Sequence, residues 1–135
     1  MKINTNIRYG LRAIVEIARS SDSVLQKEIA ERQEISVYYL DAIISGLKNA
    51  GLIVNYGGKG SGYILAKQAG EITVYDIYRA FNPDLQLVNC VCETNECKRT
   101  NICPAKDYWF ELNSKIKGIM MNKTIKDIIE ENIIA

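Results

Sequence analysis

Two helical segments followed at once by two β-prone segments restrict the fold more than any other feature of the sequence. The helical segments, about residues 26–32 and 36–49, are joined by a tight connection, and apolar residues recur in them at helical spacing. The β-prone segments, about residues 52–56 and 63–65, flank a glycine-rich turn and therefore predict a hairpin. A helix–turn–helix pair followed by a hairpin is the element order of a winged helix–turn–helix domain.

The remaining predicted elements are all helical. An amphipathic helix spans about residues 7–20, another spans 72–81, a long helix has Pro104 in its first turn, and a short last helix ends near residue 134. The positions that should cap or end the helices carry residue types suited to them: Ser36, Gly51, Thr73 with Asp76, and Thr124 with Asp127. The side chains expected to face the core from the helix at 36–49 are Val37, Leu40, Ile43, Ile44 and Leu47.

Composition excludes several classes of protein. The chain of 135 residues is long enough for a core, and its 17 basic and 16 acidic residues leave a net charge of only +1. The positive excess lies in residues 1–67, which mildly indicates an anionic partner there. No apolar run reaches the ~18–20 residues of a membrane span, and residues 1–8 lack the apolar stretch of a secretory signal. A cytoplasmic protein with no membrane partner is therefore predicted.

The sequence also argues against an enzyme. Because His is absent, His-based acid–base catalysis, Ser–His triads and zinc sites that contain His are excluded. No nucleophile–base pair is evident, and the glycine-rich segment at 57–62 precedes a strand, whereas a phosphate-binding loop precedes a helix.

The second helix of the predicted helix–turn–helix pair is the segment expected to enter the major groove of DNA. Its exposed N-terminal residues are Ser36, Tyr38, Tyr39, Asp41 and Ala42. Hydroxyl groups can bond phosphates or bases, and an Asp can accept a hydrogen bond from cytosine N4. Lys48 near the helix end and Lys59 at the hairpin tip are expected to meet phosphate, Lys59 close to a minor groove. For any one of these residues there is an alternative: Tyr38 and Tyr39 are ordinary half-buried aromatics, and the hairpin is simply a tight turn.

The cysteines form the second candidate site. All four fall within fourteen residues: Cys90, Cys92, Cys97 and Cys103. In a reducing cytosol, clustered thiols serve more often as metal or redox ligands than as disulfides. Their spacing does not make the two tight pairs that zinc sites commonly use, and it suits a loop that wraps an iron–sulfur cluster. Structural zinc and four inert cysteines remain open as alternatives.

The long helix after the cysteines carries an apolar stripe that predicts dimerisation. Apolar residues recur there at three- and four-residue spacing: Trp109, Leu112, Ile116, Ile119 and Met120. Packing of this stripe within one subunit is the alternative. The predicted fold class is mainly α with a small β-hairpin. It comprises a winged helix–turn–helix domain at residues 1–81, followed by a cysteine cluster loop and a dimerisation helix at residues 82–135.

Five short motifs lie in order over essentially the whole chain. They are TNIRYGLRA at 5–13, IAERQEIS at 29–36, Tyr39 with Leu40, GSGY at 60–63, and the cysteine loop followed by Trp109. Each motif is weak alone, but the set is specific and resembles the IscR-type repressors, a family of dimeric bacterial regulators. This family includes sensors of iron–sulfur cluster biogenesis, nitric oxide and redox state, as well as cluster-free regulators of cysteine metabolism.

The resemblance implies a homodimer whose long C-terminal helices cross beside an iron–sulfur cluster, [2Fe–2S] or [4Fe–4S]. By motif match, the cluster ligands are Cys92, Cys97 and Cys103. The recognition-helix positions carry over to Tyr38, Tyr39, Asp41 and Ala42.

This chain departs from the family at three positions. Members with a His ligand carry it where this chain has Lys106, and members that borrow an acidic residue from the partner's first helix carry it where this chain has Arg8. The fourth ligand is therefore open, with Cys90 as the first candidate and Asp107 as the second. Many members also carry an Arg in the wing where this chain has Gly57, which leaves the lone Lys of the hairpin tip as the nearby cation.

Together these features predict a homodimeric winged-helix transcription factor, expected to be a repressor. It would bind a palindromic operator on double-stranded DNA and sense Fe–S status, redox state or nitric oxide through the cluster. Loss or reaction of the cluster would release the loop at 90–103 and change how two recognition helices fit half-sites about one DNA turn apart. Two alternatives stay open: a cluster-free family member controlled by thiol chemistry or a partner protein, and an electron-transfer protein with a winged-helix docking module.

Overall fold

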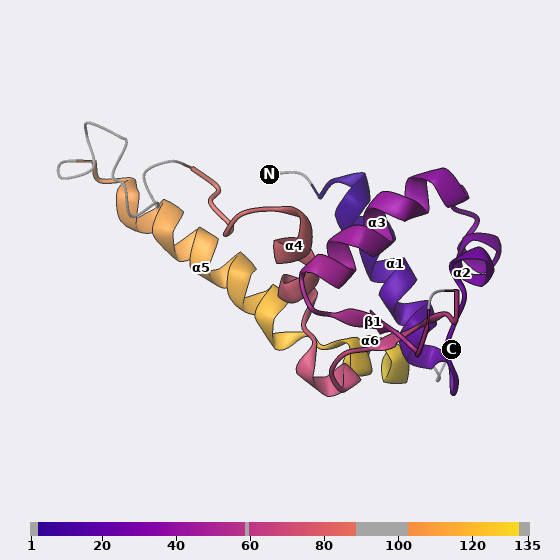
Figure 1. Cartoon of the computed structure of the whole chain (residues 1–135). Coiled ribbons are helices and arrows are strands. Elements are labelled where there is room, and N and C mark those ends of the chain that lie inside the picture. Colours follow the sequence, from indigo (N-terminus) through magenta and orange to yellow (C-terminus); the bar gives the residue numbers. More distant parts are fainter. Residues whose placement is uncertain (1–2, 59, 89–102, 133–135) are drawn as a thin grey trace.

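The computed structural model describes residues 3–58, 60–88 and 103–132 (Figure 1). Within them the elements follow the order α1 (Thr5–Arg19), α2 (Gln26–Gln33), α3 (Val37–Asn49), β1 (Ile53–Asn55), β2 (Tyr63–Leu65), η1 (Ala69–Glu71), α4 (Val74–Phe81), α5 (Lys106–Asn122) and α6 (Ile125–Asn132). The pair α2–α3 followed by the β1–β2 hairpin is a helix–turn–helix with a wing. The predicted fold class, mainly α with a small hairpin, is confirmed.

Local interactions shape the turn between α2 and α3. The Ser36 hydroxyl accepts a hydrogen bond from the Tyr39 N–H at 3.1 Å and so caps α3, as predicted. Helix α2 ends at Gln33, and its C-cap Glu34 has a left-handed backbone with φ 54° and an N–H that donates to the Ala30 carbonyl. Gly51 follows α3 with φ 76°, the left-handed conformation expected for it.

The wing is a two-stranded antiparallel hairpin whose register pairs Ile53 with Leu65, Val54 with Ile64 and Asn55 with Tyr63. The segment after α1 adds a further bridge, because the Tyr63 N–H donates to the Val24 carbonyl at 2.8 Å and the Val24 N–H donates back at 3.0 Å. Gly62 lies beside this bridge with φ 93°, and a Cβ there would lie 3.1 Å from the Val24 backbone. The close approach and the positive φ both require glycine.

The capping boxes predicted for α4 and α6 are both present. The Thr73 hydroxyl accepts from the Asp76 N–H at 3.1 Å, and the Asp76 carboxylate accepts from the Thr73 N–H at 2.9 Å. Thr124 and Asp127 repeat the pattern at 3.1 and 3.0 Å. Hydrogen bonds from Thr124, above all from its backbone N–H, hold the pKa of Asp127 below its ordinary value. The ionised Asp127 carboxylate therefore contributes to the α6 cap at neutral pH, and this contribution is lost as the pH falls through that lowered pKa. The bond from the Asp127 N–H to the Thr124 hydroxyl does not depend on it.

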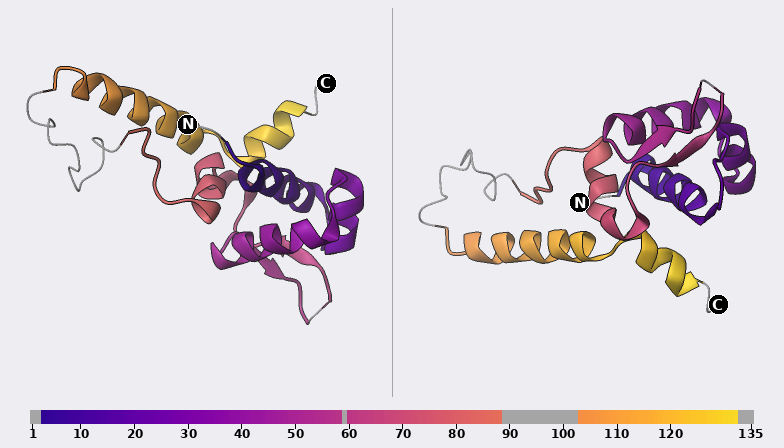
Figure 2. Two further views of the ribbon diagram at one scale, coloured as in Figure 1. Left: turned by 90° about the horizontal axis from the view of Figure 1, so that it is seen from above. Right: turned by 60° about the horizontal axis from the view of Figure 1, so that its bottom comes forward.

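The hydrophobic core lies between α1, α3, α4 and the wing, and α6 packs against α1 to extend it (Figure 2). Its largest fully buried side chains are Ile14, Val24, Ile29, Leu40, Ile43, Leu47, Ile53, Ile72, Ile77 and Ile125. Ile125 belongs to α6, and its N–H donates to the Ile72 carbonyl at 2.9 Å. The C-terminal helix thus contributes to the core of the winged body, and the domain boundary at residues 81–82 stays a prediction.

The prediction that Val37 is a core residue is wrong. Its side chain is 51% exposed, whereas the other four residues expected to face the core from α3 are buried. Val37 is the first residue of α3, and both of its neighbours in the chain are exposed. Helical spacing identifies a face of the helix, but it does not tell how far along the helix the core extends.

Two glycines allow α1 and α3 to pack closely around the ring of Phe81 at the end of α4. A Cβ on Gly10 would lie 2.7 Å from Cε2 of Phe81, and a Cβ on Gly46 would lie closer still to the other edge of the ring. Real Cβ atoms do not approach this closely, so a larger residue at either position must displace the ring. Phe81 therefore sets the distance between α3 and α1.

We expect Gly46→Ala to destabilise the protein by about 1–3 kcal/mol, the usual cost of forcing extra volume into a packed contact. Gly118→Ala is a matched control, because Gly118 also lies in a helix and a Cβ there would meet nothing within 4 Å. That change should be neutral or stabilising by up to about 1 kcal/mol. Chemical denaturation measures both values, and equal stability of the two variants would show that the Phe81 ring yields without cost.

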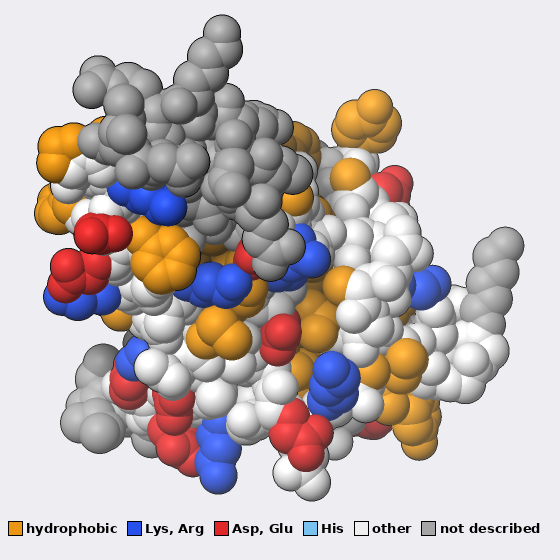
Figure 3. Space-filling view, turned by 90° about the vertical axis from the view of Figure 1, so that its left-hand side faces the viewer, with side chains coloured by type: hydrophobic (Ala, Val, Ile, Leu, Met, Phe, Trp, Pro, Cys, Tyr) orange, Lys and Arg blue, Asp and Glu red, His pale blue; other side chains and the backbone are white. Residues whose placement is uncertain are grey.

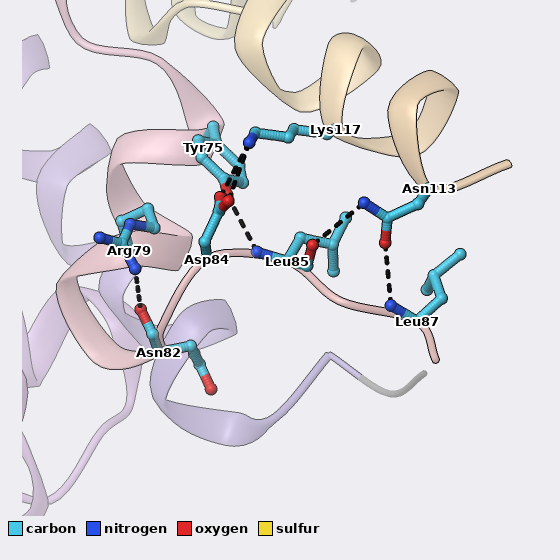
Figure 4. A network of polar contacts seen from close by, with 8 residues as sticks. All are labelled: Tyr75, Arg79, Asn82, Asp84, Leu85, Leu87, Asn113 and Lys117. Atoms are coloured by element: carbon cyan, nitrogen blue, oxygen red, sulfur yellow. Dashed lines mark hydrogen bonds and ion pairs between the residues drawn. The ribbon is translucent and has the colours of Figure 1, made fainter. Parts of the chain in front are cut away.

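Helix α5 runs away from the winged body, and none of its residues is buried (Figures 1 and 2). A polar network holds it beside the segment that follows α4 (Figure 4). The Asn113 side chain accepts from the Leu87 N–H at 2.8 Å and donates to the Leu85 carbonyl at 3.1 Å, and Lys117 forms an ion pair with Asp84 at 2.9 Å. Among the described residues, no helix is long and apolar enough to cross a membrane.

Candidate DNA-binding surface and cysteine site

The N-cap and the N-terminal half of α3 present five of the seven predicted DNA-contacting residues together. All five are exposed, Tyr38 by 88%: Ser36, Tyr38, Tyr39, Asp41 and Ala42. The last four of them also line a hollow that Asn6 of α1 completes. Asn6 was missed from the sequence, because only the fold brings the start of α1 beside α3. The surface expected to meet bases therefore has an amide at its edge, which can bond a base or a phosphate.

Asp41 has a partner within the helix–turn–helix pair. The Gln26 amide of α2 donates to Oδ1 of Asp41 at 2.5 Å and lies 3.4 Å from the Val37 carbonyl. One carboxylate oxygen thus ties α2 to α3, while Asp41 as a whole remains exposed. A base contact through the second oxygen stays a prediction.

Lysines lie where α3 and α2 meet the wing. Lys48 is exposed, and its Nζ lies 5.8 Å from the centroid of the Tyr63 ring in β2. Lys59, predicted at the wing tip, lies outside the described residues. Lys27 of α2, which the sequence did not single out, borders a hollow lined on the wing side by Asn55 and Tyr63. Lys27 and Lys48, two basic residues of the N-terminal half, thus lie near the wing.

Substitutions should separate phosphate contacts from base contacts. We expect Lys48→Ala to weaken binding to specific and random DNA alike and to lower the salt slope by about one. Asp41→Ala should instead relax sequence preference by roughly 1–3 kcal/mol at one base pair, because a carboxylate facing DNA is unfavourable without a cytosine amino group. Binding isotherms at several salt concentrations and binding selections measure the two effects. Identical sequence logos for wild type and Asp41→Ala would mean that Asp41 does not read bases.

Cys103 is the described member of the predicted cluster ligands. Outside the described residues lie the other three, Cys90, Cys92 and Cys97. Cys103 is a half-buried free thiol, and its carbonyl accepts the Lys106 N–H at 3.3 Å in a turn that leads into α5. Helix α5 begins after this turn, with Ala105 as its N-cap. Pro104 therefore precedes the helix, whereas the sequence placed it in the first turn.

The chemistry of the donor set fits an iron–sulfur cluster. Thiolates are the usual ligands of such clusters, and the chain supplies four thiols within fourteen residues. Asp107, the second candidate for the fourth ligand, is exposed in the first turn of α5. Among the residues that the structure describes, no group of three or more His, Cys, Asp or Glu side chains is placed to hold a metal ion.

An apolar groove lies between α1 and α5, and three residues of the predicted dimer stripe line it. Its lining is Ile3, Ile7, Arg8, Leu11, Val74, Ile116, Ile119 and Met120. Ile119 is 71% exposed, while Trp109, Leu112, Ile116 and Met120 are only half-buried. Figure 3 shows apolar side chains at the surface among charged ones, below the residues drawn in grey. The described part of one subunit therefore does not bury the stripe, and dimerisation through it stays a prediction.

A helix–turn–helix with a wing, whose second helix exposes aromatic, hydroxyl and carboxylate side chains, defines the class of winged-helix DNA-binding proteins. The profile of the Rrf2 family, described as iron-dependent transcriptional regulators, matches residues 3–131. The sequence is 30% identical over 131 residues to the HTH-type transcriptional regulator IscR of Cronobacter sakazakii, covering 96% of this chain and 80% of that protein. The chain belongs to the Rrf2 family, whose members are DNA-binding transcriptional regulators and not enzymes.

Solved structures give the same result. The structure of CymR (YrzC), described as the global cysteine regulator of B. subtilis, superposes with a TM-score of 0.81 at 29% identity, covering 97% of this chain and 98% of that chain. IscR of T. potens superposes with a TM-score of 0.77 at 28% identity, covering 98% of this chain and 88% of that one. Both comparisons extend over the winged body and α5, so the whole described arrangement is shared.

Proposed function

We propose that this protein is a cytoplasmic, homodimeric repressor that binds a palindromic operator and senses Fe–S status, redox state or nitric oxide through an iron–sulfur cluster. The observation that carries the proposal is the group of four thiols that leads directly into α5. Support also comes from the iron-dependent description of the family and from the similarity to IscR proteins.

The proposed cluster ligands are Cys92, Cys97 and Cys103, with Cys90 as the first candidate for the fourth position and Asp107 as the second. When bound, the cluster supplies a centre that reacts with oxidants or nitric oxide. Cys103 precedes α5 by one turn, so a change at its sulfur acts on the start of that helix. Within the chain, Asn113 and Lys117 of α5 hold the segment after α4, which offers a route to the winged body.

A second copy of the chain is the proposed occupant of the groove between α1 and α5. The groove and the adjoining stripe are apolar, and Ile119 is already exposed in one subunit, so burying it against a partner is favourable. In the proposed dimer the two α3 helices lie on one face, an arrangement that suits half-sites about one DNA turn apart.

A thiol switch without a cluster is the second candidate. It is favoured by the similarity to CymR, the global cysteine regulator of B. subtilis. In that case the same four cysteines would act directly, by forming disulfides or mixed disulfides when the thiol pool is oxidised.

Anaerobic purification followed by visible spectroscopy and iron and sulfide quantitation separates the two candidates. A brown protein with sulfide-to-iron charge-transfer bands, and iron and sulfide in comparable amounts, is expected for the cluster. Operator binding should then change when the cluster is oxidised or removed. A colourless, iron-free protein whose DNA binding responds to a mild thiol oxidant would overturn the cluster proposal and support the thiol switch.

A further inference from the structure

We propose that Arg12 of α1 is a positioning residue for DNA reading, which holds the turn between α2 and α3 and orients Tyr39 on α3. The inference deepens the DNA-binding function and rests on it. Arg12 lies 27 positions before Tyr39 in the chain, so only the fold brings the two residues into one set of contacts.

The first set of contacts joins Arg12 to the end of α2. Its Nε donates to Oε1 of Gln33 at 2.9 Å, and its Nη2 donates to the main-chain carbonyl of Gln33. Gln33 is the last residue of α2, where carbonyls have no partner within the helix. The next residue, Glu34, has the left-handed conformation that turns the chain toward α3. Arg12 therefore ties down the backbone at the point where the direction of α3 is decided.

The same Gln33 side chain is held from its other side by Glu16. Its amide Nε2 donates to Oε1 of Glu16 at 2.7 Å, and the Glu16 side chain is only 6% exposed. Arg32 of α2 lies 3.7 Å from the other Glu16 oxygen. The Gln33 amide thus bonds two α1 residues one helical turn apart, and charge-assisted bonds of this kind resist displacement. The α2–α3 turn is held against α1 as a unit.

The second set of contacts leads from Arg12 to Tyr39. The guanidinium carbon of Arg12 lies 5.2 Å from the centroid of the Tyr9 ring, within the range of a cation–π contact. Tyr9 meets Tyr39 edge to face, with centroids 5.5 Å apart and planes at 78°. Tyr39 is 40% exposed and lines the hollow of the DNA-facing surface. Its ring orientation therefore depends on Tyr9, and that of Tyr9 depends on Arg12.

Arginine suits this place and lysine does not. The planar guanidinium bonds two acceptors of Gln33 while its face lies on a ring, whereas an ammonium is a single point of charge. The rival interpretation is that Arg12, being exposed, simply contacts a phosphate. The two interpretations differ for Arg12→Lys, because a phosphate contact survives an exchange of one cation for another.

The test measures binding of the full-length wild type and its variants to two duplexes. One is the duplex that the wild type most enriches from a random-sequence library, and the other is a random duplex of equal length. We expect Arg12→Lys to lose affinity for the enriched duplex about tenfold, the usual size of a coupling between contacting residues, and to bind random DNA with an unchanged salt slope. Tyr9→Leu should show the same selective loss, and Tyr9→Phe should resemble wild type. The double variant Arg12→Lys/Tyr9→Leu should lose little more affinity for the enriched duplex than either single variant does.

Arg19→Lys is the matched control, since Arg19 also lies on α1 and its described contact is an ion pair with Glu16 at 3.6 Å. It should bind both duplexes as wild type does. Wild-type selectivity in Arg12→Lys would overturn the proposal. It would also be overturned if Arg12→Gln lost affinity for the enriched and the random duplex equally, with a lower salt slope. If Arg12→Lys unfolds at a lower temperature than wild type, the Tyr9 variants test the proposal instead. A selective loss of affinity for the enriched duplex in Tyr9→Leu but not in Tyr9→Phe supports it, and equal binding by the two variants overturns it. Failure of the wild type to enrich any sequence would instead overturn the operator proposal itself.

Discussion

Cys103→Ala is expected to bring the iron content of anaerobically purified protein close to background while leaving the fold intact. The thiolate at this position is one of three cysteine ligands proposed for the cluster, and its removal takes away one of the protein's bonds to iron. The fold should persist because Cys103 is only half-buried and lies outside the hydrophobic core. Cys92→Ala and Cys97→Ala should behave in the same way. Iron quantitation, with circular dichroism as the measure of folding, checks all three.

Two further variants address the fourth ligand. Cys90→Ala should lower iron content, and Asp107→Asn should not, if Cys90 fills that position; the opposite result would assign Asp107. Lys106→Ala is the control, because the side-chain amine of lysine is a poor ligand for iron and its loss should leave iron unchanged. Normal iron in any one of the three variants at positions 92, 97 and 103 would remove that residue from the ligand set.

Ile116→Glu is expected to convert the protein to monomers and to weaken operator binding severely. Ile116 lines the apolar groove between α1 and α5, and burial of an unpaired carboxylate in an apolar interface is strongly unfavourable. A single winged body reaches only one half-site, so the loss of the dimer removes the gain from simultaneous binding. Sedimentation velocity measures the oligomeric state, and binding to a full and a half operator measures the consequence.

Ile119 provides the variant that separates assembly from folding. Its side chain is 71% exposed within one subunit, so Ile119→Ser costs the monomer little, yet it should weaken the dimer if the groove is the interface. Ser114→Glu is the matched control on α5, because Ser114 is exposed and does not line the groove. Folded dimers for both Ile116→Glu and Ile119→Ser would show that the stripe is not the dimer interface.

The two candidate sites lie at opposite ends of one set of contacts. Cys103 leads into α5, α5 is held to the segment after α4 by Asn113, and Phe81 at the end of α4 packs between α1 and α3. Helix α1 in turn carries Arg12, which holds the turn before α3. A change of the cysteine site that moves α5 therefore has a physical connection to the DNA-facing surface.

Features that depend on neighbours within a few residues were predictable from the sequence. The Ser36 cap needs only the Tyr39 N–H three positions on, and each Thr–Asp capping box likewise closes within four residues. The hairpin follows from β-prone residues around glycines that accept positive φ. The fold class and the family followed from such local patterns read in order. The exposure of Val37 could not be predicted from such patterns, because it depends on where along α3 the hydrophobic core ends.

The sequence alone determined the α-helices and the hairpin, the winged helix–turn–helix order and the chemical types of the candidate sites, because helix periodicity, caps and clustered thiols are local. The short 3₁₀ turn η1 was not predicted. The tertiary structure decided which distant side chains meet. It joined Gln26 to Asp41, Arg12 to Gln33 and Tyr9 to Tyr39, and it brought Ile125 from the far end of the chain into the core. These contacts depend on how helices cross, which is set by the packing of all the side chains between them and by close approaches such as that of Gly46 to Phe81.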